Sequence, residues 1–304
     1  MAEVCDERSE DRGSIMAKTY YIGIDGGGTK TKFDLFDSDK NSIASITMPT
    51  IHPAQTSFKE AVSVLTDAKE KLLENINDSD YILKVGAGLG GYGINADYRK
   101  KLEDEFSTVF DEFKLYSDAY AAMLGALAGE DGILMIAGTG SIALAKIGDE
   151  TFRCGGFGYR YGDEGSAYSI GKGLISMALK EADGRSDKSV ISDIVEDYFD
   201  NISFNMIATS DFSRDKIAGL AAAASKYVDI SESVRDIFFT AAKEISLHIR
   251  AIGKNFESGK RIRLSYIGGV FKSEYILECI KDMNQGIELV APIYPPEKGS
   301  ILQV

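Results

Sequence analysis

The most informative stretch of this chain is YIGIDGGGTKTKFDLFD, at residues 21–37. A short apolar run at residues 20–25 stops at three glycines, and residues 32–37 then partly alternate polar and apolar side chains. This pattern predicts two strands joined by a glycine turn whose backbone N–H groups can approach an anion such as phosphate. A Walker A loop requires GxxxxGK[ST] before a helix, and a Rossmann turn requires GxGxxG, and neither pattern is present.

The same pattern recurs later in the chain. The apolar run ILMIA at residues 133–137 leads into GTGS at residues 138–141 and then into IALAKI at residues 142–147. The segment IDGGGT (residues 24–29) thus aligns with IAGTGS (residues 136–141). Two such hairpins at a domain-sized separation predict two related halves. Two unrelated glycine hairpins are the alternative.

Strands and helices alternate through the rest of the chain. Apolar spacing predicts helices over residues 57–76, 97–106, 119–128, 168–179, 216–228 and 233–256, and a last helix beginning within residues 294–299. Further strands are expected over residues 81–85, 113–116 and 263–267. The expected fold class is therefore α/β, with helices covering sheets and a hinge near residues 117–129.

Length and charge limit the possible partners. A chain of 304 residues is long enough for two domains. A net charge of −13 opposes binding to nucleic acid or to an anionic membrane. No apolar run approaches the roughly 18 residues that a membrane span needs. We therefore expect a soluble protein with no nucleic-acid or membrane partner.

Cysteine and histidine usage narrows the chemistry. The three cysteines are far apart and form no CxxC pair, which predicts neither a disulfide framework nor a cysteine metal site and favours a cytoplasmic location. Only two histidines are present, so a carboxylate is the expected catalytic base. Residues 1–17 are charged and have no apolar region, so we expect them to be a disordered leader.

Five ordered motifs together resemble one family. These are DGGGTKT, AGTGS, SDAYAAMLGAL, GGFGYRYGDEGSAY and YIGGVF, and the resemblance that they carry extends over about residues 20–300. They resemble the N-acetylglucosamine kinase branch of the BadF/BadG/BcrA/BcrD ATPase family, within the sugar kinase, Hsp70 and actin superfamily. The resemblance implies two ribonuclease-H-like (actin-like ATPase) domains, over residues 18–118 and 119–291, with ATP, Mg²⁺ and a sugar in the cleft between them. Residues 292–304 would return to the N-terminal domain.

The resemblance also implies a set of site residues. Phosphate contacts would come from Gly26, Gly27, Gly28, Thr29, Lys30, Thr31, Gly138, Thr139, Gly140 and Ser141, with Gly268 and Gly269 against the adenosine. Sugar contacts would come from His52, Asp118, Thr139, Gly156, Phe157, Gly158 and Asp163, and Asp25 would bind Mg²⁺ through water.

Asp118 is the expected general base, because a carboxylate there can accept the proton of an attacking sugar hydroxyl. A plain helix cap is the alternative for Asp118, and a complement to the helix dipole is the alternative for Asp163.

Two departures from the family pattern leave the sugar open. His52 stands in a loop where the family commonly has Asn, and Phe157 stands where it has Trp. His52 can replace the amide as a hydrogen-bond donor, or it can be a solvated loop residue. His248 lies at helical spacing among apolar residues and is expected to pack inside a helix bundle.

The expected function is ATP-dependent phosphorylation of an amino sugar or hexose, with N-acetylglucosamine at its 6-hydroxyl as the first expectation. Glucosamine, N-acetylmuramic acid or another hexose are alternative substrates. An iron–sulfur activator ATPase and a non-catalytic sugar-sensing protein are alternative functions. The expected partners are ATP, Mg²⁺ and a small-molecule sugar. The sequence leaves open whether the protein forms a homodimer.

Overall fold

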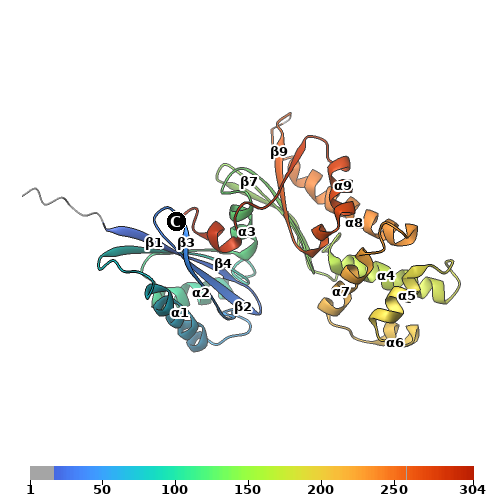
Figure 1. The fold of residues 1–304 in the computed structure, drawn as a ribbon, viewed down its shortest axis with the longest axis horizontal. Coiled ribbons are helices and arrows are strands. Elements are labelled where there is room, and N and C mark those ends of the chain that lie inside the picture. The colour runs from blue at the N-terminus through green and yellow to red at the C-terminus, as the bar shows by residue number, and fades with distance from the viewer. Residues whose placement is uncertain (1–16, 258) are drawn as a thin grey trace, which may run out of the picture.

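The computed structural model describes residues 17–257 and 259–304. All but the last residue of the expected leader at residues 1–17 therefore lies outside the described part of the chain. Two five-stranded sheets form two lobes, and the segment in the red end of the colour scale returns to the lobe that holds the N-terminal strands (Figure 1). Within the described ranges, no helix has the length and apolar character needed to cross a membrane.

The first lobe is built on a sheet with the strand order β3-β2-β1-β4-β5. Its strands are β1 (Lys18–Gly26), β2 (Lys30–Phe36), β3 (Ser42–Pro49), β4 (Tyr81–Leu89) and β5 (Phe113–Ser117). Helices α1 (Phe58–Leu73) and α2 (Ala96–Val109) lie together on one side of this sheet (Figure 1). Ser57 and Glu60 form a capping box that starts α1 next to the expected residue.

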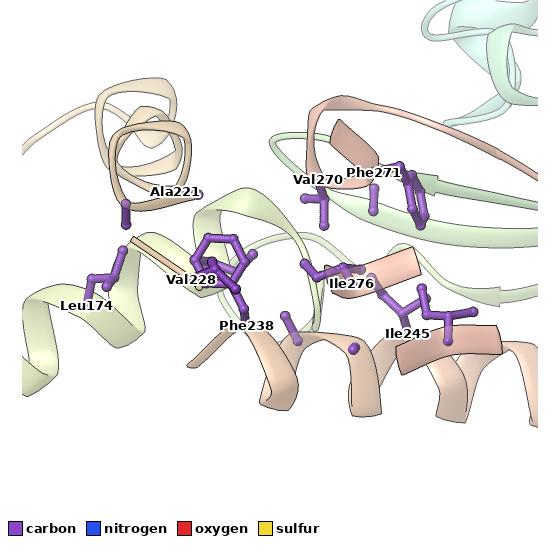
Figure 2. Close-up of a cluster of buried hydrophobic side chains, with 14 of the residues drawn as sticks. Leu174, Ala221, Val228, Phe238, Ile245, Val270, Phe271 and Ile276 are labelled. Atoms are coloured by element: carbon purple, nitrogen blue, oxygen red, sulfur yellow. The ribbon is translucent and has the colours of Figure 1, made fainter. Parts of the chain in front are cut away.

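The second lobe is built on a sheet with the strand order β10-β9-β6-β7-β8. Its strands are β6 (Gly132–Ala137), β7 (Ser141–Ile147), β8 (Glu150–Gly155), β9 (Ile262–Ile267) and β10 (Ile287–Val290). Its helices are α4 (Ala167–Ala182), α5 (Val190–Tyr198), α6 (Phe204–Thr209), α7 (Arg214–Ser225), α8 (Glu232–Gly253) and α9 (Glu274–Met283), with a 3₁₀ turn at Gly269–Lys272. Figure 2 shows Leu174, Phe238 and Ile245 in the buried apolar cluster that joins these helices to the sheet.

The two sheets share one topology. β1 pairs antiparallel with β2 and parallel with β4, and β6 pairs antiparallel with β7 and parallel with β9. The outer strands repeat the match, since β3 and β8 are antiparallel to their neighbours while β5 and β10 are parallel to theirs. The expected α/β class with two related halves is therefore confirmed.

Helices α3 (Asp118–Ala126) and α10 (Pro296–Ser300) follow the last strand of each sheet and pack against each other. A Cβ atom at Gly299 would overlap with the carbonyl oxygen of Ala121 and the backbone nitrogen of Gly125, so this approach requires glycine. The segment before α10 is also bound to α3, because Tyr294 N donates to Gly125 O at 3.0 Å. The two lobes thus meet through backbone contacts between these helices.

Each of these helices packs against the sheet of the other half. Ala122, Met123 and Ala126 of α3 share an apolar cluster with Leu134 of β6 and Leu144 of β7. α10 contacts β1, β2 and β4 of the first sheet. Ser300 Oγ donates to Gly86 O of β4 at 2.8 Å. The segment at residues 296–300 is therefore part of the first lobe.

Candidate active site

A cavity of about 510 Å³ lies between the two lobes and is lined from both. Among the residues expected at the site, it brings together Asp25, Asp118, Gly138, Thr139, Gly140, Ser141, Gly156 and Asp163. We call this cavity the cleft. Asp25 comes from β1 of the first sheet, and the turn at residues 138–141 joins β6 to β7 of the second. Residues far apart in the sequence therefore meet in the cleft, whereas residues 26–31 of the first glycine turn are not part of its lining.

The second glycine turn is held rigidly at the start of α4. Gly138 N donates to Gly140 O at 2.9 Å inside the turn. Ala167 N, at the first residue of α4, donates to Gly138 O at 2.8 Å, and Ser141 Oγ donates to Glu164 O at 2.7 Å. These bonds fix the turn to the loop that carries Asp163.

The first glycine turn is more exposed. Gly28, Thr29 and Lys30 face solvent, and Gly27 N donates to Lys30 O at 3.0 Å. Thr31 differs from its neighbours, because it is fully buried and its hydroxyl accepts a hydrogen bond from Ile51 N at 3.3 Å. The side chain of Thr31 therefore supports the hairpin from inside the lobe, and the exposed part of the turn ends at Lys30.

Asp118 is an exposed carboxylate at the first residue of α3. The cap of this helix is Ser117, whose hydroxyl accepts from Tyr120 N at 3.2 Å. Asp118 Oδ1 accepts from Ala119 N at 2.8 Å, and its side chain lines the cleft. Because Ser117 supplies the cap, the carboxylate of Asp118 is not needed for it.

Asp25 is a half-buried carboxylate in an acidic neighbourhood. The pKa of Asp25 is raised to about 6. Burial is the main cause, and the charges of Glu297 and Asp118 act in the same direction. Lys32 and Lys30 act in the opposite direction, but Lys32 is itself bound to Glu297. Burial therefore disfavours the ionised form of Asp25 most, and the two neighbouring carboxylates add to that effect.

Asp163 is buried and paired with a cation. Its backbone has a φ of +59°, its exposed fraction is 4%, and its Oδ2 accepts from Arg214 Nη2 at 2.6 Å. Arg214 is the first residue of α7, and our sequence reasoning missed it. No motif or spacing signals Arg214, because only the fold brings α7 beside the 155–166 loop.

A second cavity of about 420 Å³ adjoins the second glycine turn. Gly138 and Thr139 line both this cavity and the cleft. The 3₁₀ turn contributes Gly269 and Val270, and α7 contributes Ala218 and Ala222 among mostly apolar groups. Gly268, with a φ of +118°, lies directly under Ala137 and Gly138. An apolar cavity of this kind has the character of a site that can take a nucleotide base and its ribose.

Three expected sugar contacts, His52, Phe157 and Gly158, lie outside the lining of the cleft. A Cβ atom at Gly90 would lie 3.3 Å from His52 Cδ2 and 3.8 Å from Asp118 Oδ2, so both side chains approach this glycine. His52 Nδ1 accepts from Ala54 N at 3.2 Å. Phe157 is 80% exposed and lies near the guanidinium of Arg153. His248 packs inside the second lobe as expected, with an exposed fraction of 7%.

Proteins of known sequence match this chain over most of its length. The chain is 28% identical over 267 residues to an N-acetylmuramic acid/N-acetylglucosamine kinase of Clostridium acetobutylicum, covering 84% of this chain and 86% of that protein. It is 29% identical over 199 residues to a glucosamine kinase of Vibrio cholerae, covering 63% of this chain and 65% of that protein.

Solved structures show the same fold. A protein of Chromobacterium violaceum, provisionally named an N-acetylglucosamine kinase, superposes with a TM-score of 0.73 at 24% identity, covering 93% of this chain and 98% of that one. The glucokinase of the ROK family from Streptomyces griseus superposes with a TM-score of 0.55 at 17% identity, covering 93% of this chain and 97% of that one. At these identities the likeness concerns the fold.

The family resemblance carried by the five sequence motifs is confirmed. A match over residues 22–303 runs from within β1 to beyond α10 and takes in both glycine turns, so the chain belongs to the BadF/BadG/BcrA/BcrD ATPase family.

Proposed function

We propose that this protein is an ATP-dependent kinase that phosphorylates a hydroxyl of an amino sugar, with the 6-hydroxyl of N-acetylglucosamine as the first candidate. The observation that carries the proposal is that Asp118 and the Gly138–Ser141 turn line one cavity, which supports the roles of base for Asp118 and of phosphate binding for the turn. The names of the relatives support a phosphotransferase acting on amino sugars. ATP is the phosphate donor that membership of an ATPase family supports.

In this mechanism Asp118 accepts the proton of the attacking hydroxyl. The hydroxyl oxygen forms a bond to the γ-phosphorus, and the bond from that phosphorus to the oxygen bridging it to the β-phosphate breaks, which releases ADP. The backbone N–H groups of the two glycine turns hold the phosphates, and the apolar cavity beside Gly269 holds the adenosine. Closure of the two lobes would exclude water from the γ-phosphate.

The residues present fit a magnesium ion bound together with nucleotide. Within the described part of the chain, no three carboxylate, histidine or cysteine side chains form a metal cage. Mg²⁺ commonly binds through one or two carboxylates, water and substrate phosphates. Asp25 suits this arrangement, because it is a carboxylate that lines the cleft and has the carboxylates of Glu297 and Asp118 in its neighbourhood, whose negative charge a cation would offset. When bound, the ion would screen the phosphate charge.

The choice of sugar would depend on the loops at the edge of the cleft. Asp163 and Gly156 line the cleft directly, while His52 approaches it from the side of Gly90. A buried carboxylate such as Asp163 suits a ligand rich in O–H donors. Glucosamine, N-acetylmuramic acid and glucose are the other substrates to compare.

A sugar panel tests the proposal. The protein is incubated with ATP, Mg²⁺ and each of N-acetylglucosamine, glucosamine, N-acetylmuramic acid and glucose, and ADP release and product mass are measured. We expect stoichiometric ADP and sugar phosphate with at least one amino sugar. ATP hydrolysis without any sugar phosphate would indicate an activator ATPase, and sugar binding without turnover would indicate a sensor. Either result would refute the kinase proposal.

A further inference from the structure

The side chain of Arg214 is packed onto the middle of the second glycine turn. A Cβ atom at Gly140 would overlap with Arg214 Nη2 and would also lie 2.8 Å from Asp163 Oδ2. Ser213 caps α7, because its hydroxyl accepts from Lys216 N at 3.2 Å. This cap fixes the backbone of Arg214 at the start of the helix. The guanidinium carbon lies 5.5 Å from the centroid of the Tyr159 ring. Glycine at position 140 thus leaves room for a cation beside the turn.

The guanidinium has unused hydrogen-bonding capacity. Arginine carries five N–H donors in a planar fork. Its Nη2 donates to Asp163, whereas its Nε is buried and has no partner among the described residues. The side chain of Arg214 is 37% exposed, so it is not sealed inside the lobe. A buried donor without a partner is costly and is readily satisfied by an anionic ligand at the turn.

Asp163, the present partner of Arg214, lines the cleft where the sugar is expected. A carboxylate that accepts hydrogen bonds from sugar hydroxyls has fewer lone pairs left for the guanidinium. Arginine binds phosphate oxygens in a bidentate manner, so a phosphoryl group at the Gly138–Ser141 turn offers it a second partner of the same charge. The geometry therefore allows Arg214 to exchange one anion for another.

We propose that Arg214 is a catalytic residue that binds the transferring phosphoryl group. A sugar bound to Asp163 weakens the Arg214–Asp163 pair and so frees the guanidinium to bind that group. This inference rests on the proposed kinase function. As the γ-phosphoryl group passes from ATP to the sugar oxygen, ADP leaves and the hydroxyl proton passes to Asp118. Arg214 donates hydrogen bonds to the non-bridging oxygens and exchanges no atoms. Without sugar, Arg214 stays on Asp163 and ATP hydrolysis stays slow.

Steady-state kinetics with a sugar that the panel identifies as a substrate provide the first test. We expect Arg214→Gln to lower kcat by about 10²- to 10³-fold while the KM for the sugar stays within a few-fold. Arg214→Lys should recover little, because an ammonium lacks the bidentate fork. Arg185→Gln is the matched control, since it breaks the exposed Arg185–Asp183 pair at the end of α4. A loss confined to the sugar KM, or a kcat within three-fold of the parent, would overturn the proposal.

Nucleotide affinity without sugar provides the second test. The dissociation constants of Mg·ADP and of a non-hydrolysable Mg·ATP analogue are measured by calorimetry for the parent, Asp163→Asn and the Asp163→Asn/Arg214→Gln double variant. Asparagine tolerates the positive φ at this position, so the single variant should fold. We expect Asp163→Asn to increase the preference for the triphosphate by about ten-fold, and the double variant to lose that gain.

Equal preference in the single and double variants would show that the freed guanidinium does not bind the γ-phosphate, and would overturn the proposal. This measurement requires no sugar turnover. Its failure is therefore distinguishable from a failure of the sugar panel.

Discussion

Asp118 and Asp25 line the same cleft from different elements, Asp118 at the start of α3 and Asp25 near the end of β1. Burial, then the charge of Glu297 and then that of Asp118, raise the pKa of Asp25 to about 6. The two aspartates are thus electrostatically coupled, so a change at the expected base should be felt at the expected metal ligand.

This coupling predicts a shift in the pH dependence of metal–nucleotide binding. If only ionised Asp25 supports Mg·ADP, affinity should fall as the pH drops through about 6. Asp118→Asn removes a negative charge, lowers the pKa of Asp25 and should keep Mg·ADP bound to a lower pH. Calorimetry at several pH values checks this, and protonation of ADP itself is common to both proteins. An unchanged midpoint would show that the two carboxylates do not interact.

The catalytic step should depend on Asp118. Asp118→Asn retains the size of the side chain but cannot accept a proton, so kcat should fall by about 10²- to 10⁴-fold while sugar and nucleotide still bind. Asp193→Asn is a suitable control, because Asp193 is also an acidic residue in the first turn of a helix. Steady-state kinetics and calorimetry measure both effects. Retention of more than about a tenth of the parental rate would contradict the role of base.

Sugar preference should respond to the two positions that depart from the family pattern. His52→Asn and Phe157→Trp, alone and together, should change the ratio of kcat/KM between N-acetylglucosamine and glucose. A hydrogen bond worth about 1 to 3 kcal/mol corresponds to a several-fold to hundred-fold change in that ratio. The same ratio in all three variants would show that neither side chain reaches the group that distinguishes the sugars.

Buried Glu105 should make stability depend on pH. Its carboxylate is fully buried on α2, and both oxygens lack a hydrogen-bond partner among the described residues. Desolvation raises its pKa to about 7, although Lys101 Nζ, 3.9 Å from Oε1, acts in the opposite direction. Because the folded pKa lies above the unfolded one, this group's contribution to stability is present below about 4.5 and is lost as the pH rises through about 7.

Glu105→Gln should therefore gain stability relative to the parent, by about 1 to 3 kcal/mol, between pH 5 and pH 8. Urea unfolding at the two pH values measures this difference, with Glu70→Gln at an exposed position of α1 as the control. A stability difference that does not change with pH would mean that Glu105 keeps the same charge in both states.

The contact between α3 and α10 should tolerate no side chain at Gly299. Gly299→Ala would place a methyl group against Ala121 O and the backbone of Gly125, and overpacking of this kind costs about 1 to 3 kcal/mol. Gly253→Ala is the matched control, because its Cβ would meet only Ile262 Cδ1 at an ordinary 3.7 Å. Chemical denaturation should show a loss for Gly299→Ala alone, and equal stability of both variants would contradict the expected clash.

Sequence reasoning located the elements that carry strong local signals. The glycine turns are bounded by apolar runs, and α1, capped by Ser57, begins one residue from the expected position. A serine cap alone is a weaker signal, because α5, α6 and α9 also follow serine caps and none of them was expected. β3 was not assigned, because this edge strand at Ser42–Pro49 is partly exposed along its length and carries only a weak apolar pattern. Propensity and periodicity therefore identify buried strands and amphipathic helices better than they identify strands at the edge of a sheet.

The candidate site divides in the same way. Asp118 and the second glycine turn follow strands, so their placement at the cleft follows from the local pattern together with the family resemblance. Arg214 follows no such rule, because its place beside Gly140 results from how α7 packs in the second lobe. The burial of Thr31 likewise depends on the neighbouring segment at Ile51. Contacts of this kind are tertiary, and a single sequence holds no local signal for them.

The packing of α10 on the first sheet has a consequence for how the protein folds during synthesis. The first sheet is complete when β5 leaves the ribosome, but its partner α10 lies almost two hundred residues further along the chain, where Ser300 binds Gly86 across a separation of 214 residues. Such long-range contacts slow folding and expose unfinished surface during synthesis. The first lobe can therefore complete its packing only after the second lobe has been translated.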